Sequence, residues 1–382
     1  MQQLNILPFG FLFSAYYLRK ASKHFNLSAF ACYNPVKQGH MTRPEPAIQS
    51  RNQSVDAFRL LASLGVIILH VEYPNVPGDI AVGLRLMSRW AIPFFFIVSG
   101  YYLAEKNSTT NRLKIQPTIE RLIWVFLLWS LIYAPIVIHQ HDIITLIKRL
   151  ASPTFILFGD FYHLWFISSL ALGYISIAFF NRFNSKILLP VVSAFSVIIA
   201  LLAGSYAIFD FDFSLDFDTA RQWLAIPFLY IGFLFLKNRQ PSWWVSIVWI
   251  IIGSGLQIIE AKFLGRQFGS SAYDHQFLIG TIPLAIGMAE LALGNFKLPG
   301  FSIFSRWGRD YSLGIYLIHP LIIYILSILI SAPGLISSAV WQVTLPLTVL
   351  ILSIFVLSLI NRYLPSGFKI LFGEHLKTSS DR

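Results

Sequence analysis

Long apolar runs recur along this chain and constrain its fold more than any other feature. About ten of them are long enough, or nearly so, to cross the hydrocarbon core of a membrane, which takes about 20 helical residues. They lie at roughly 55–74, 83–103, 120–139, 164–181, 187–209, 222–236, 243–260, 277–294, 311–331 and 340–364. Because hydrocarbon offers the backbone no hydrogen-bond partners, such runs must be helices. The sequence therefore predicts an all-α fold, a polytopic membrane bundle of about ten spans.

The composition also favours a membrane protein over a soluble one. Of the 382 residues, 55% are hydrophobic and only 12% are charged, whereas soluble domains carry about 25% charged residues. The single cysteine, Cys32, excludes an intrachain disulfide and a multi-cysteine metal site. No histidine has carboxylates or thiolates clustered at ligand spacing, so we predict no metal centre. The sequence also lacks a P-loop and a dinucleotide-binding fingerprint.

The basic residues fall mainly on one predicted side of the membrane. An even number of spans places both termini on the same side, and most Lys and Arg residues fall there. They are Arg43, Arg51, Lys106, Arg112, Lys114, Arg121, Arg182, Lys186, Lys237, Arg239, Lys297, Arg306, Arg309, Arg362, Lys369, Lys377 and Arg382. The positive-inside rule then predicts cytoplasmic termini in the inner (plasma) membrane. This bias accounts for most of the formal net charge of +11, so we expect no nucleic-acid partner.

The chain divides into three predicted segments. Residues 51–365 hold all the spans, and residues 366–382 are predicted to be a cytoplasmic tail. Residues 1–50 contain no acidic residue before Glu45, and their apolar stretch is too short to span a membrane comfortably. They are either a cytoplasmic or interfacial extension or, in the interpretation we favour, an untranslated lead-in to a true start at Met41.

Two ionisable side chains share one face of the first span. Arg59 and His70 are eleven residues apart, which is about three full helical turns and about 16 Å along the axis. Ionisable groups at membrane depth are costly and are functional candidates by default. A guanidinium suits phosphate and an imidazole suits general-base work, so the pair predicts a site for a long ligand such as acyl-coenzyme A. The alternative is that Arg59 pairs with Asp56, one turn earlier, while His70 bonds a carbonyl.

Two further arginines are candidates for the same site. Arg89 enters the second span near the predicted depth of His70, where it would stabilise an oxyanion, orient the imidazole or pack at the interface. Arg121 lies at the predicted cytoplasmic start of the third span. It is either a second phosphate ligand or part of the topology signal.

Four other polar or aromatic residues are candidates for substrate binding or for structural roles. His163 and Trp165 stand at the outer start of the fourth span, where an aromatic interface role is the alternative. Tyr316 and His319 share a face of the ninth span. The adjacent Pro320 removes a backbone hydrogen bond, so we expect a kink around a cavity.

Four stretches in order, "VDAFRLLASLGVIILH", "RWAIPFFFIVSGYYL", "HLWFI" and "YSLGIYLIHP", resemble the acyltransferase 3 family of integral membrane acyltransferases, which decorate bacterial surface glycans. The first resembles the Arg-x10-His hallmark of that family and falls on Arg59 and His70. The resemblance covers roughly residues 51–365. This chain departs from the family at Trp124, where members often have a second arginine in the third span. The absence of a fused hydrolase-like domain leads us to expect a stand-alone member.

The resemblance implies transfer of an acyl group, expected to be acetyl, from cytoplasmic acyl-coenzyme A to a hydroxyl of a glycan or lipid-linked sugar. Arg59, with Arg121, would hold the donor phosphates. His70 would act as general base or as acyl carrier, and Arg89 would stabilise the oxyanion. The alternative function is a transporter or flippase for glycans or polar solutes, because intramembrane Arg and His are also typical there. Covalent movement of labelled acyl groups into glycan would distinguish the two.

Overall fold

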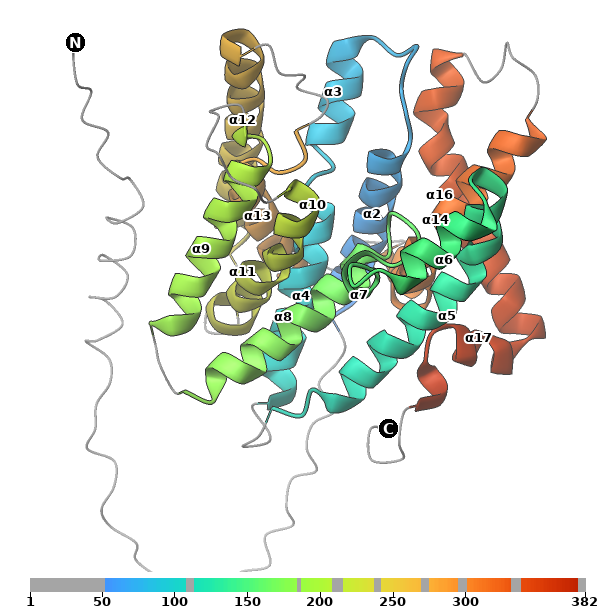
Figure 1. The fold of residues 1–382 in the computed structure, drawn as a ribbon. Coiled ribbons are helices and arrows are strands. Elements are labelled where there is room, and N and C mark those ends of the chain that lie inside the picture. The colour runs from blue at the N-terminus through green and yellow to red at the C-terminus, as the bar shows by residue number, and fades with distance from the viewer. Residues whose placement is uncertain are drawn as a thin grey trace, which may run out of the picture. The chain divides into compact units, whose positions relative to one another are not determined.

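The structure is a computed structural model that describes residues 52–107, 113–183, 187–207, 216–236, 242–268, 275–294, 301–330 and 338–376. The predictions for residues 1–50, including the start at Met41, lie outside this part. Across the described residues the chain forms helices and no β-strand, and Figure 1 shows the helices gathered into a bundle. The predicted all-α fold is confirmed.

Six described helical stretches are long and apolar enough to cross a membrane. They are α2 (Gln53–His70), α3 (Gly78–Leu86) continued by α4 (Ala91–Asn107), α5 (Gln116–Gln140), α12 (Trp243–Phe268), α14 (Phe301–Leu329) and α16 (Ala339–Tyr363). Large apolar side chains cover their outward faces; Leu131 on α5 is 70% exposed and Ile259 on α12 is 67% exposed. Apolar surface on this scale is not typical of a soluble monomer, so the chain is a multi-pass membrane protein.

Shorter elements complete the bundle. They are α6 (Ile143–Ala151), α7 (Phe155–Phe158), α8 (Trp165–Asn181), α9 (Leu188–Ala203), α10 (Phe217–Ala220) and α13 (Thr281–Leu293). The predicted span 222–236 is a helix of changing pitch, divided into η2 (Arg221–Leu224), α11 (Ala225–Tyr230) and the π-helical turn η3 (Ile231–Leu236). This segment crosses α4 so closely that a Cβ added to Gly232 would lie 1.9 Å from the Ile97 carbonyl oxygen. Only glycine permits such a backbone contact.

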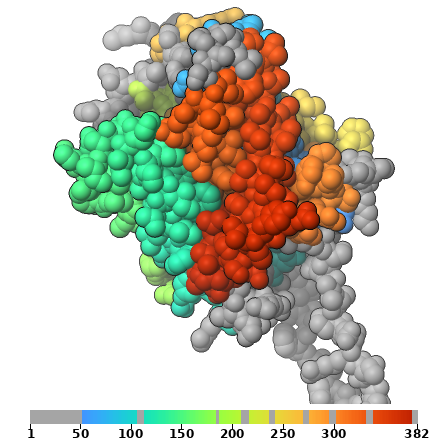
Figure 2. Space-filling model, turned by 90° about the vertical axis from the view of Figure 1, so that its right-hand side faces the viewer, coloured from blue at the N-terminus to red at the C-terminus, as the bar shows by residue number. Residues whose placement is uncertain are grey.

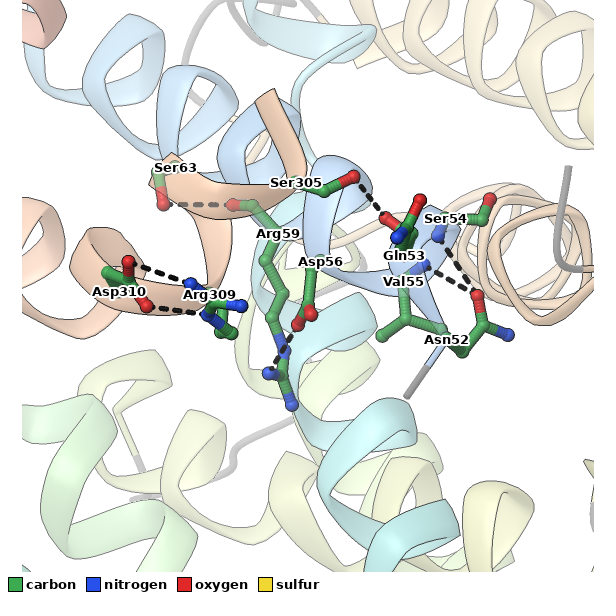
Figure 3. Close-up of polar contacts among 10 residues, drawn as sticks. All are labelled: Asn52, Gln53, Ser54, Val55, Asp56, Arg59, Ser63, Ser305, Arg309 and Asp310. Atoms are coloured by element: carbon green, nitrogen blue, oxygen red, sulfur yellow. Dashed lines mark hydrogen bonds and ion pairs between the residues drawn. The ribbon is translucent and has the colours of Figure 1, made fainter. Parts of the chain in front are cut away.

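Helices α2 and α14 pack together along the middle of the bundle. A Cβ added to Gly308 would lie 1.7 Å from the carbonyl oxygen of Asp56, so the two backbones touch there. Beside this contact the Ser305 hydroxyl donates a 2.7 Å hydrogen bond to the Gln53 carbonyl (Figure 3). Helix α14 therefore starts ahead of the predicted span 311–331, because its polar first turns are held by α2 rather than by lipid.

The C-terminal segment packs against α5 (Figure 2). It consists of α17 (Pro365–Leu371) and the 3₁₀ turn η4 (Glu374–Leu376). The last carbonyls of a helix have no partner within it, and here three side chains of α5 donate to carbonyls at the end of α17. The bonds run from Trp124 to Ile370 at 2.8 Å, from Trp129 to Leu371 at 3.1 Å and from Arg121 to Phe372 at 2.8 Å. The predicted tail thus contains a helix that is fixed to the bundle.

Candidate active site

A cavity of about 700 Å³ lies among α2, α4, α5, α8, α14 and α17, at the end of the bundle where α2 and α5 begin. We call this the Arg59 end. The charged residues that line the cavity are Arg59, Arg121, Arg309, Asp310, Lys369 and Glu374. The apolar and aromatic residues that line it include Phe95, Val98, Phe166, Ile167, Leu170 and Tyr316. The cavity thus joins a polar mouth to an aromatic interior.

Both predicted phosphate ligands line this cavity. Arg59 lies 3.1 Å from the carboxylate of Asp56, and its guanidinium stands 5.3 Å from the centre of the Tyr102 ring. Figure 3 shows the Arg59–Asp56 pair at the start of α2. Arg121, on α5, lies 3.9 Å from the carboxylate of Glu374. The pair with Asp56, our alternative for Arg59, is therefore present, and Arg59 also faces the cavity.

Three histidines predicted on separate spans come together at the far end of α2. The ring centre of His319, on α14, lies 5.2 Å from that of His70 and 5.9 Å from that of His163. His163 belongs to the turn before α8, and Tyr162 beside it stands 5.0 Å from His70. Each residue was a candidate from sequence, but the pattern did not predict that they meet. We call His70, His163 and His319 the histidine cluster.

Tyr316 connects the cavity to the histidine cluster. It lines the cavity, and its hydroxyl donates a hydrogen bond to the backbone carbonyl of His163. Its ring centre lies 6.0 Å from that of His319 and 4.9 Å from that of Phe166. The cavity therefore runs from the two arginines to the edge of the histidine cluster.

The imidazoles of His163 and His319 are buried in the bundle. Nδ1 of His319 lies 3.1 Å from the Ile315 carbonyl, so in the neutral ring Nδ1 carries the proton and Nε2 is an acceptor. Within the described part of the chain, Nε2 of His319 and both ring nitrogens of His163 are buried without a hydrogen-bond partner. Buried polar atoms are rarely left unbonded in proteins, so these three nitrogens make the histidine cluster a candidate for function. The described residues contain no group of three His, Cys, Asp or Glu arranged to hold a metal ion.

Tyr133 is a site residue that sequence reasoning missed. Its buried hydroxyl donates to the Leu317 carbonyl at 2.8 Å and accepts from the Leu321 amide at 3.2 Å. A regular helix would join these two groups directly, and Pro320 lies between them. The hydroxyl thus enters α14 at the proline, beside His319. The available signal was a tyrosine deep in an apolar span, where its hydroxyl needs a partner.

Arg89 lies in a second, smaller cavity of about 70 Å³ together with Trp165 and Arg221. The Arg221 guanidinium stands 4.6 Å from the centre of the Trp165 ring and 3.1 Å from the carboxylate of Asp218. Sequence reasoning missed Arg221, whose only signal was a cation at the start of a predicted span.

A pair of stacked aromatic rings lies where the two cavities approach each other. Phe166 lines the larger cavity and Phe96 lines the smaller one. Their rings are stacked with centres 4.9 Å apart. This pair therefore lies between the space that contains Arg59 and the space that contains Arg89.

Comparison with known proteins identifies the family of this chain. A family model described as an acyltransferase domain matches residues 52–361. The chain belongs to the acyltransferase 3 family. It is 26% identical over 301 residues to a serine/alanine racemase of Enterococcus gallinarum. That alignment covers 71% of this chain and 40% of the racemase. It is also 24% identical over 300 residues to an amino-acid racemase of Enterococcus faecalis. That alignment covers 73% of this chain and 42% of the racemase.

The chain therefore spans well under half the length of these two relatives. No solved structure matches it.

Proposed function

We propose that this acyltransferase 3 family member is an inner-membrane O-acyltransferase. It takes an acyl group, acetyl in our proposal, from cytoplasmic acyl-coenzyme A and delivers it to a hydroxyl of a surface or exported glycan, or of a lipid-linked sugar. One observation carries the proposal: a single cavity has Arg59 and Arg121 at one end and, at the other, Tyr316 in contact with the histidine cluster.

The donor fits this cavity in one direction. Its phosphates bind at the Arg59 end, since a guanidinium donates paired hydrogen bonds to phosphate and keeps its charge. Its flexible arm lies along the apolar and aromatic interior. Its thioester then reaches the edge of the histidine cluster, near His70, about 16 Å along α2 from Arg59.

His70 acts on the acceptor hydroxyl in the proposed reaction. Its imidazole takes the hydroxyl proton while the oxygen attacks the thioester carbonyl carbon. The carbon–sulfur bond then breaks, and the leaving thiolate of coenzyme A takes the proton from the imidazolium. Arg89 stabilises the negative charge that develops on the carbonyl oxygen, and His319 orients His70 by ring contact. Transient transfer of the acyl group onto His70 is the alternative route, and trapping of an acyl-enzyme distinguishes it.

The test is acyl transfer by the full chain in isolated membranes. With acetyl-coenzyme A labelled in the acetyl group, the wild type should place base-labile label in glycan. His70→Ala should lower the transfer rate by about 10²–10⁴, the contribution of a general base. His141→Ala is the matched control, because His141 is exposed just after α5. Equal transfer by His70→Ala and wild type, at equal membrane levels, would show that His70 is not the base.

The same assay separates transfer from transport. The two relatives named above are racemases of amino acids by name, and the chain covers 40% and 42% of them. Their names therefore do not define the chemistry of this chain. Movement of an intact solute across the membrane, with no new ester formed, would support a transporter and reject the acyltransferase proposal.

A further inference from the structure

The C-terminal segment, residues 365–376, forms one wall of the larger cavity. Four of its residues, Phe368, Lys369, Phe372 and Glu374, line the cavity. The match to the family model ends at residue 361, so membership of the family assigns this segment no role. Its contacts with α5 and with the cavity define what it contributes to the site.

The segment is held firmly in place. Three donors from α5 bond its successive carbonyls at residues 370–372. Phe368 and Phe372 are buried, with ring centres 4.6 Å apart, and the Phe372 ring is stacked on Trp129 with centres 6.3 Å apart. The backbone that carries Lys369 is therefore fixed on both sides, and its side chain lines the mouth of the cavity.

Lys369 differs from the other cations of the cavity in having no acidic partner. The three arginines are each paired: Arg59 with Asp56 at 3.1 Å, Arg309 with Asp310 at 2.6 Å and Arg121 with Glu374 at 3.9 Å. Within the described residues no carboxylate lies within 4.0 Å of the Lys369 ammonium. The uncompensated positive charge at the cavity mouth thus comes from the C-terminal segment.

We propose that Lys369 binds a phosphate of the acyl donor and that the C-terminal segment completes the donor site. This inference rests on the proposed function. A coenzyme A donor carries a diphosphate and a separate phosphate, more negative charge than two arginines that already face carboxylates can match. The lysine ammonium is a compact charge with three donors, which suits phosphate. Glu374, at the long distance of 3.9 Å from Arg121, gives way when a phosphate arrives.

The test measures binding of coenzyme A itself to the purified full-length protein in lipid nanodiscs, by calorimetry. Lys369→Met should raise the Kd for coenzyme A about tenfold, because it removes one partly exposed charge-assisted hydrogen bond. Lys369→Arg should retain binding. Lys148→Met is the matched control, an exposed lysine on α6 that does not line the cavity. In acyl transfer, KM for the donor should rise while kcat stays constant.

A second variant in the same segment should act in the opposite direction. Glu374→Gln removes a negative charge beside Arg121, so coenzyme A should bind more tightly, and binding should fall more steeply with added salt. Damage to the segment would instead weaken binding in both variants. Opposite signs for Lys369→Met and Glu374→Gln therefore show a charge effect, and monodisperse elution of each variant confirms folding.

The outcomes distinguish failure of the Lys369 proposal from failure of the proposed function. If the wild type binds coenzyme A and Lys369→Met binds it as Lys148→Met does, this inference is overturned and the proposed function stands. If Glu374→Gln weakens binding as Lys369→Met does, the segment is structural and the inference is again overturned. If the wild type neither binds coenzyme A nor transfers acyl groups, the proposed function itself fails.

Discussion

Replacing Tyr133 by Phe tests whether a hydroxyl inserted into α14 supports the histidine cluster. The substitution keeps the ring, which stacks on Phe161 with centres 4.4 Å apart, and removes only the oxygen. That oxygen bonds the Leu317 carbonyl and the Leu321 amide. Tyr133 is 0% exposed, so water cannot readily replace the lost partner.

The magnitude follows from the two lost bonds. Each hydrogen bond contributes about 1 kcal/mol net to stability, which gives about 2 kcal/mol for Tyr133→Phe. The Leu317 carbonyl and Leu321 amide can recover part of this by bonding each other, so the expected loss is about 1–2 kcal/mol. That recovery would move His319, which lies between them, and a shift of about 1 Å in a reacting group can lower a rate about 100-fold.

Two measurements check this expectation. Thermal unfolding in detergent at a fixed scan rate should show a lower midpoint for Tyr133→Phe, and acyl transfer should show a lower kcat. Tyr324→Phe is the matched control, because the Tyr324 hydroxyl also joins α14 to α5, by a 2.6 Å hydrogen bond with His139, but on the exposed side of the bundle. If the two variants match in midpoint and in kcat, the role assigned to the Tyr133 hydroxyl is wrong.

Two more substitutions test the packing and the separation of the cavities. Gly308→Ala places a methyl group against the Asp56 carbonyl and should destabilise the bundle by about 3 kcal/mol or more. The yield of monodisperse protein measures this, and Gly255→Ala, where a Cβ meets nothing within 4 Å, should be neutral. Phe96→Ala removes one of the two stacked rings between the cavities, so water should reach the thioester. Free acetate should then rise relative to acetylated glycan, and an unchanged ratio in folded protein would contradict a separating role.

The sequence was sufficient for the bundle and for the face shared by Arg59 and His70. Long apolar runs require helices in lipid, and the helical period fixes which residues of one helix align. The irregular segment at 221–236 and the early start of α14 were not predicted. Both depend on glycines in backbone contact with another helix, at Gly232 and Gly308. The hydropathy of a sequence does not predict contacts between helices.

The site was predicted residue by residue but not as an arrangement. The candidates His163 and His319 lie on separate elements, and nothing in their own spans shows that His319 meets both His163 and His70. That meeting depends on how α2 and α14 cross. Arg221, in the small cavity with Arg89, resembled an ordinary cation at the end of a span until its contact with Trp165 was seen.

Trp124 shows why a departure from a family pattern needs a structure to interpret it. In sequence it stands where members of the family often have a second arginine. In the structure its indole nitrogen donates to the Ile370 carbonyl, one residue beyond Lys369, and so helps to fix the segment that lines the cavity. If Lys369 binds phosphate as we propose, Trp124 has a role in the site although it carries no charge. It holds in place the C-terminal segment, which supplies the cation. The positive charge at the cavity mouth is then a property of two segments about 240 residues apart, which no single motif contains.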